Sequence, residues 1–281
     1  MKKRLLCLAA ALLVLAGCAG AGHGAPESVN VPILMYHHID DTGGADAVIS
    51  QAAFRHQMDV LQESGYTPVS FDDLMAYVDG EGTLPERPVC ITFDDGYEST
   101  YERAFPVLRE YRFPATVFVI GCSVGHKEFY KDTAWPITPH FDLEQMAEMV
   151  ADRLMAVQSH TYDMHQWAPF ETDAPRTSIL PMEGETEEAY IAALKEDFQK
   201  EADILAAGGV EKIQVLAYPL GRSCDLAEQT LAELGVRVTL TIDSAHVNTV
   251  IQGRPETLLG LGRMNMGDDT TDEALLAYLA Q

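Results

Sequence analysis

The chain has 281 residues, a mass of 30.8 kDa and a formal net charge of −24, because 43 acidic residues outnumber 19 Lys and Arg. So negative a surface repels nucleic acid and anionic lipid headgroups, and we expect no nucleic-acid partner. Hydrophobic residues make up 47% of the chain, which excludes wholesale disorder. Five cysteines are too few for a disulfide scaffold.

Residues 1–17 have the pattern of a cleaved export signal. Three basic residues precede an apolar run that ends at Ala16 and is too short to cross a bilayer, which takes about 20 residues. The sequence Leu-Ala-Gly-Cys then ends at Cys18 and resembles the bacterial lipobox, in which the cysteine is lipidated; a plain secretory signal is the alternative. We therefore predict a protein outside the cytoplasm, either anchored to the membrane through a lipid on Cys18 or secreted.

Two further segments follow this signal, namely a flexible tether over 18–30 and a folded domain over 31–281. Signal cleavage would remove three basic residues and leave a net charge of −27. The cysteines that then remain besides Cys18 cannot all pair, and we expect each to be a small buried hydrophobic residue. They are Cys90, Cys122 and Cys224.

Short β-branched runs alternate with segments of helical period throughout the domain. We predict strands at Val31–Tyr36, Tyr66–Val69, Val89–Phe93, Ala115–Ile120, Leu154–Gln158, Ile213–Tyr218, Val236–Ile242 and Leu258–Met264. Helix caps are predicted at Ser50 and Thr186, and capping boxes at Ser70 with Asp73, Asp142 with Gln145, and Asp225 with Glu228. This alternation predicts an α/β fold, a distorted (β/α) barrel of seven or eight parallel strands, with a doubly wound open sheet as the alternative.

Polar groups follow four of these strands at their C-terminal ends, the rim that carries the active site of barrel enzymes. They are His37, the pair Asp94 and Asp95, the pair His160 and His165, and the turn around Leu220. Two polar loops, 122–140 and 166–185, follow strands at the same rim. Two histidines and one carboxylate form a catalytic zinc ligand set. They also describe the facial triad of non-haem iron oxygenases, which needs a different scaffold.

Four motifs, in this order, resemble those of the polysaccharide deacetylases, carbohydrate esterase family four. They are ILMYHHI at 33–39, TFDDGY at 92–97, SHTYDMH at 159–165 and AYPLG at 217–221. The Tyr-His motif and the His-x₄-His pair are similar to the circularly permuted branch, which includes secreted deacetylases of poly-β-1,6-N-acetylglucosamine. The resemblance covers about residues 31–281 and implies a catalytic domain with a barrel of the polysaccharide-deacetylase type.

The resemblance also implies roles for individual residues. Asp95, His160 and His165 would hold a divalent metal, usually zinc, with cobalt or nickel as alternatives. Asp94 would be the general base that takes a proton from the attacking water. His37 would be the general acid that protonates the leaving amine.

Two positions depart from the family pattern. Leu220 stands where other members usually have Tyr or Phe, although its backbone N–H could still stabilise the oxyanion. Ala217 stands where non-permuted relatives have the arginine that restrains the catalytic aspartate. We expect Arg263 to fill that role, the alternative being a surface arginine. Arg176 and Glu185 are candidates for substrate contacts.

These residues favour a metal-dependent deacetylase that hydrolyses the N-acetyl groups of an extracellular or cell-wall polysaccharide containing N-acetylglucosamine. An O-acetyl glycan esterase, acting for instance on acetylxylan, is a chemically similar alternative. A non-catalytic glycan-binding lipoprotein is the alternative from a different class. The sequence predicts no particular oligomeric state.

Overall fold

The computed structural model describes residues 27–281 except 45–46, 132, 166–175 and 177. The predicted signal peptide, Cys18 and residues up to 26 of the predicted tether therefore lie outside the described residues, and the lipid anchor stays a prediction. Within the described ranges, no helix combines the length and the apolar character that a membrane span requires.

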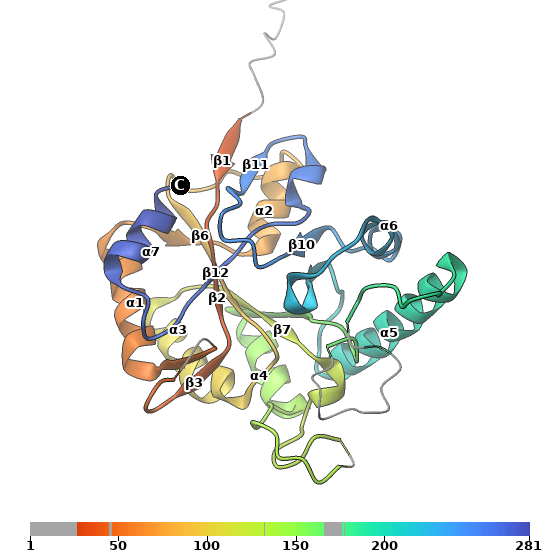
Figure 1. The fold of residues 1–281 in the computed structure, drawn as a ribbon. Coiled ribbons are helices and arrows are strands. Elements are labelled where there is room, and N and C mark those ends of the chain that lie inside the picture. The colour runs from red at the N-terminus through yellow and green to blue at the C-terminus, as the bar shows by residue number, and fades with distance from the viewer. Residues whose placement is uncertain (1–26, 45–46, 132, 166–175, 177) are drawn as a thin grey trace, which may run out of the picture.

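A curled parallel sheet forms the centre of the molecule (Figure 1). Its strand order is β10 (Val238–Leu240), β9 (Val215–Ala217), β8 (Met155–Ser159), β7 (Ala115–Val119), β6 (Pro88–Phe93), β2 (Ile33–Tyr36) and β12 (Met264–Asn265). From β2 to β10 the strands lie in the order of the chain, without the reversal of a doubly wound sheet. The sheet is thus a distorted barrel of seven strands, which confirms the predicted architecture.

Smaller ladders flank this sheet. β5 (Thr67–Pro68) pairs with the start of β6, β1 (Ser28–Asn30) pairs with β11 (Thr249–Ile251), and β3 (His38–Asp40) pairs with β4 (Val48–Ser50). A parallel bridge between Leu240 and Leu261 joins β10 to the segment before β12. The two edges of the curled sheet therefore approach each other through this segment.

Helices surround the sheet (Figure 1). Their buried apolar residues belong to the two hydrophobic clusters that the strands also form. They are α1 (Gln51–Glu63), α2 (Phe71–Val78), α3 (Phe105–Tyr111), α4 (Leu143–Asp152), α5 (Glu187–Ala207), α6 (Asp225–Glu233) and α7 (Asp272–Leu279). A π-helical turn, Thr100–Ala104, leads into α3, and short 3₁₀ turns lie at Gly121–Ser123, Pro219–Gly221 and Pro255–Leu258.

Most of the predicted caps are confirmed. The side chains of Ser50 and Thr186 cap α1 and α5, and capping boxes form at Ser70 with Asp73 and at Asp142 with Gln145. The predicted box of Asp225 with Glu228 is wrong, because Cys224 is the N-cap residue of α6 and makes no side-chain capping bond. The Glu228 carboxylate instead accepts hydrogen bonds from Tyr218 (3.0 Å) and Thr239 (2.7 Å).

The last predicted strand, Leu258–Met264, is also different in the structure. Its start belongs to the Pro255–Leu258 turn, and regular pairing begins only at β12. Gly260, with φ of 68°, interrupts the extended backbone between them. The cysteine prediction holds for Cys90 and Cys122, which are buried, whereas Cys224 is only half-buried; all three are free thiols.

Candidate active site

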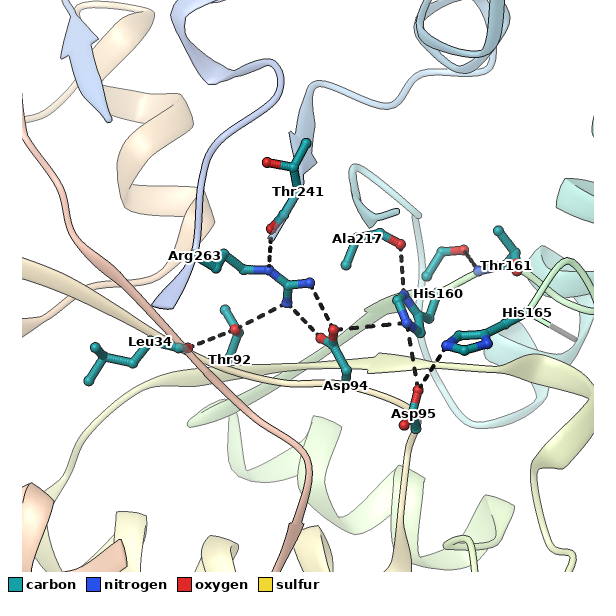
Figure 2. Close-up of polar contacts among 11 residues, drawn as sticks. Leu34, Thr92, Asp94, Asp95, His160, Thr161, His165, Ala217, Thr241 and Arg263 are labelled. Carbon is teal, nitrogen blue, oxygen red and sulfur yellow. Dashed lines mark hydrogen bonds and ion pairs between the residues drawn. The ribbon is translucent and has the colours of Figure 1, made fainter. Parts of the chain in front are cut away.

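The parallel register brings the predicted site residues to one rim of the sheet. Tyr36 lies opposite Phe93 on neighbouring strands, and Val119 of β7 lies opposite Ser159 of β8. The residues that directly follow these strands therefore emerge side by side, and among them are His37, Asp94 and His160. Figure 2 shows Asp94, Asp95, His160 and His165 close together with Arg263.

Asp95, His160 and His165 form a compact cluster of metal-ligand type. Oδ1 of Asp95 lies 3.6 Å from Nε2 of His160 and 3.6 Å from Nε2 of His165 (Figure 2). One ligand atom from each residue lies within 4.8 Å of the other two. The buried Asp95 Oδ1 accepts no hydrogen bond from the described residues, although buried polar atoms nearly always have a partner. A divalent cation would satisfy this oxygen and both nitrogens, so these residues fit the predicted ligand set.

The backbone after β6 separates the two neighbouring aspartates. Asp95 adopts a left-handed conformation with φ of 71°, and Gly96 follows with φ of 83°. A Cβ at position 96 would lie 3.3 Å from Val119 Cγ1, so both the conformation and the close approach favour glycine there. As a result Asp94 points toward Arg263, while Asp95 points toward the histidines (Figure 2).

His160 is fixed in one orientation by the strand beside it. Its Nδ1 lies 2.7 Å from the carbonyl oxygen of Ala217, which can only accept, so Nδ1 carries the proton and donates it. Nε2 therefore presents its lone pair to Asp95. Burial lowers the pKa of His160 to about 4, which keeps the imidazole neutral near neutral pH. A backbone carbonyl that orients a ligating imidazole in this way is a common feature of metal sites.

Asp94 forms a buried ion pair with Arg263. The guanidinium donates from Nη1 to Oδ1 at 2.6 Å and from Nη2 to Oδ2 at 2.8 Å, and its Nε donates to Thr241 O at 3.0 Å. Arg263 is 0% exposed, so it is not a surface arginine. Burial acts to raise the pKa of Asp94, but the charge of Arg263 and its hydrogen bonds outweigh it and hold this pKa well below its ordinary value.

A pocket of about 480 Å³ opens over the cluster. It is lined by His37, Ala47, Asp95, Tyr97, Ile120, Ser123, Tyr130, Pro136, Ile137, Thr138, His140, His165 and Leu220. Nδ1 of His37 is buried and has no partner among the described residues. Leu220 has φ of 56° within the Pro219–Gly221 turn, and its side chain is exposed. His37 and Leu220 thus border the same space as Asp95 and His165.

Two lining residues were missed by the sequence reasoning. The rings of Tyr97 and His140 lie with their centroids 4.9 Å apart, and the two residues form an isolated antiparallel bridge. Tyr97 belongs to the TFDDGY motif, and His140 ends the polar loop over 122–140. Their positions in that motif and that loop could have identified both residues as candidates for the lining of the site.

Other predicted residues lie outside the pocket. Arg176 and Glu185 form a buried ion pair with each other, and Arg176 also donates to Leu180 O at 2.9 Å. Neither residue lines the pocket described above, and the expectation that they contact substrate stays a prediction. His38, on the other side of the chain from His37, lies 2.8 Å from Ser99 Oγ through its Nδ1.

Known proteins support this architecture. A family model described as polysaccharide deacetylase matches residues 81–239. The Bacillus subtilis (strain 168) protein YxkH, named for the same family, is 26% identical over 253 residues, 90% of this chain and 77% of the relative. Poly-beta-1,6-N-acetyl-D-glucosamine N-deacetylase of Escherichia coli (strain K12) is 28% identical over 76% of this chain, which spans 34% of that relative. The solved structure of IcaB from Ammonifex degensii has a TM-score of 0.71 at 26% identity, with 90% of this chain and 97% of that chain covered. Because the family model matches more than half of its residues, the chain belongs to the polysaccharide deacetylase family.

Proposed function

We propose that the protein is a metal-dependent deacetylase that removes N-acetyl groups from a polysaccharide containing N-acetylglucosamine. The observation that carries this proposal is the buried Asp95 Oδ1, which has no hydrogen-bond partner among the described residues and lies 3.6 Å from an imidazole nitrogen of each histidine. Asp95 and His165 also line the pocket. The relatives named as poly-beta-1,6-N-acetyl-D-glucosamine N-deacetylases support N-deacetylation of a glycan.

Asp95, His160 and His165 would hold the metal ion. When bound there, a divalent cation such as zinc, cobalt or nickel lowers the pKa of a water and polarises the acetyl carbonyl. Asp94 lies next to this cluster, with its Oδ2 3.9 Å from Nε2 of His160. Because Arg263 keeps Asp94 ionised and fixed, Asp94 is placed to accept a proton from the attacking water.

His37 and Leu220 complete the proposed machinery from other strand ends. His37 borders the pocket with its Nδ1 buried and unpartnered among the described residues, and it would protonate the leaving amine. Leu220 would donate its backbone N–H to the developing oxyanion, a role that needs no particular side chain. The exposed Leu220 side chain adds an apolar surface to the lining of the pocket in place of an aromatic ring.

We further propose that the enzyme acts outside the cytoplasm, held to the membrane by a lipid on Cys18 or secreted. The export signal and the lipobox-like sequence support this location. Fractionation of cells that express the full chain tests the anchor, because Cys18→Ser should move the protein from the membrane to the soluble fraction. Continued membrane retention of this variant would contradict the lipid anchor.

Acetate release from defined glycans tests the activity. We would offer β-1,6- and β-1,4-linked N-acetylglucosamine oligomers and acetylxylan, with and without chelator, and use His160→Ala as the inactive control. The proposal predicts chelator-sensitive acetate from an N-acetylglucosamine oligomer. Acetate from acetylxylan alone would favour the O-acetyl esterase, and no chelator-sensitive acetate from any substrate would favour a glycan-binding protein.

A further inference from the structure

The turn between the two candidate metal-ligating histidines is unusual in how its backbone is held. Every backbone N–H from His160 to Met164 donates to a protein acceptor. Those of His160, Thr161 and Met164 donate to Val119 O (2.8 Å), Ser159 Oγ (3.0 Å) and Thr161 Oγ1 (3.2 Å). The two at the centre of the turn, on Tyr162 and Asp163, donate to one carboxylate that lies 35 and 34 residues further along the chain.

That carboxylate belongs to Asp197 on α5. Its Oδ2 accepts from the Tyr162 N–H at 2.9 Å and its Oδ1 accepts from the Asp163 N–H at 2.9 Å. Asp197 is 8% exposed, and burial raises its pKa to about 6. An asparagine would avoid the cost of burying a charge, but it would offer one acceptor oxygen to two N–H groups. The geometry therefore requires a carboxylate at this position.

The turn needs such support because its own conformation is strained. Thr161 has φ of 72°, a left-handed conformation that a β-branched residue rarely adopts. The N–H groups of Gly121 and Cys122 in addition donate to the carbonyls of Thr161 (3.2 Å) and Tyr162 (2.9 Å). Asp197, Gly121 and Cys122 thus hold by hydrogen bonds a turn whose two ends carry His160 and His165.

We propose that Asp197 is a positioning residue for the metal site. By binding the backbone of Tyr162 and Asp163, it sets the distance between the two histidine ligands without touching either of them. This inference rests on the proposed function only in requiring that the site bind a divalent cation, and it is independent of the glycan. Partners outside the ligand set typically change metal affinity by about 10–100-fold.

Zinc affinity of the full mature chain tests the proposal. We would measure the zinc Kd by competition with a chromogenic chelator, and the melting temperature of the metal-free protein, for the wild type, Asp197→Asn and Asp203→Asn. Asp203 is the matched control, because it lies exposed on the same helix, where it accepts a hydrogen bond from Gln199 at 2.8 Å. We expect zinc binding about 10–100-fold weaker for Asp197→Asn and unchanged for Asp203→Asn.

Cobalt gives a second readout that a purely structural role would not change. The visible absorption bands of cobalt-substituted Asp197→Asn should shift and weaken relative to wild type, because the spacing of the histidines has changed. A zinc Kd within twofold of wild type together with unchanged cobalt bands would overturn the proposal, even if the melting temperature falls. If Asp197→Asn does not fold, Asp197→Glu keeps both acceptor oxygens but displaces them, and the same two results decide the question.

The outcomes separate this inference from the proposed function. A wild-type protein that binds zinc but releases no acetate from any glycan would contradict the enzyme activity and leave the role of Asp197 standing. If the wild type releases acetate and Asp197→Asn binds zinc normally, the enzyme activity would stand and the role of Asp197 would be contradicted.

Discussion

Replacing Arg263 with methionine should strongly destabilise the protein at neutral pH. The change removes the guanidinium and leaves the carboxylate of Asp94, whose side chain is 3% exposed, buried without its counter-charge. It removes two short charge-assisted hydrogen bonds, of 2.6 and 2.8 Å. Breaking a buried ion pair from one side costs about 3–5 kcal/mol, so we expect a loss of this size in the free energy of unfolding.

The pH dependence of this loss follows from the pKa of Asp94. In the wild type that pKa lies below its unfolded value of about 3.9, so the ion pair stabilises the fold fully above pH 4 and less as the pH falls through the folded pKa. In Arg263→Met, burial alone should raise the pKa of Asp94 above the unfolded value. The buried charge then penalises the variant at neutral pH, and protonation relieves this penalty as the pH falls. The difference between the two proteins should therefore shrink toward pH 4.

Denaturant unfolding of the metal-free proteins measures this difference. Arg263 also donates to Thr241 O, so a double-mutant cycle with Asp94→Asn is needed to isolate the ion pair. With Asn at position 94, the Arg263→Met change should cost much less than in the wild type. A cost below about 1 kcal/mol at pH 7, or an equal cost in both backgrounds, would refute the argument.

Three other substitutions test separate parts of the site. Asp94→Asn should lower turnover by about 10²–10⁴-fold with little change in zinc content by metal analysis; equal loss of zinc would mean that the two aspartates have exchanged roles. His37→Ala should lower turnover with zinc content unchanged, and a fully active variant would exclude His37 as the acid. Gly121→Ala should cost about 1–3 kcal/mol in thermal unfolding, because its Cβ would lie 2.0 Å from Glu201 Oε2, and a neutral result would show that Glu201 can move aside.

The positions of site residues that directly follow a strand could be predicted from the sequence. A parallel sheet brings the C-terminal ends of its strands to one rim, so the residues after β2, β6 and β8 had to lie together once the strands were located. Arg263 is a different case, because it comes from the end of the chain and contacts Asp94 across 169 residues of sequence. The family resemblance led us to expect an arginine beside the catalytic aspartate. Only the structure shows that the guanidinium of Arg263 donates two hydrogen bonds to Asp94.

Hydrogen bonds between an acidic side chain and partners outside its local sequence could not be predicted. The pattern of Asp225 and Glu228 is typical of a capping box, but Tyr218 and Thr239 offer Glu228 two buried partners that the local sequence does not reveal. Asp197 was hidden for the same reason, because it lies on the buried side of a helix and its partners are backbone groups of a distant turn. Local sequence patterns predict hydrogen bonds between near neighbours, whereas Glu228 and Asp197 accept hydrogen bonds from residues at least 10 positions away in the sequence.

The two adjacent aspartates show how one fold gives the same residue type two different tasks. Two neighbouring carboxylates in a buried site repel each other, and one of them would ordinarily be protonated. The left-handed backbone at Asp95 turns them apart, so that Arg263 neutralises Asp94 while Asp95 points toward His160 and His165. The ligand cluster then carries one uncompensated negative charge and two imidazoles, a combination suited to a divalent cation. In the proposed mechanism, the Arg263–Asp94 pair would therefore do more than hold the general base in place, because it would leave the carboxylate of Asp95 available to a metal ion.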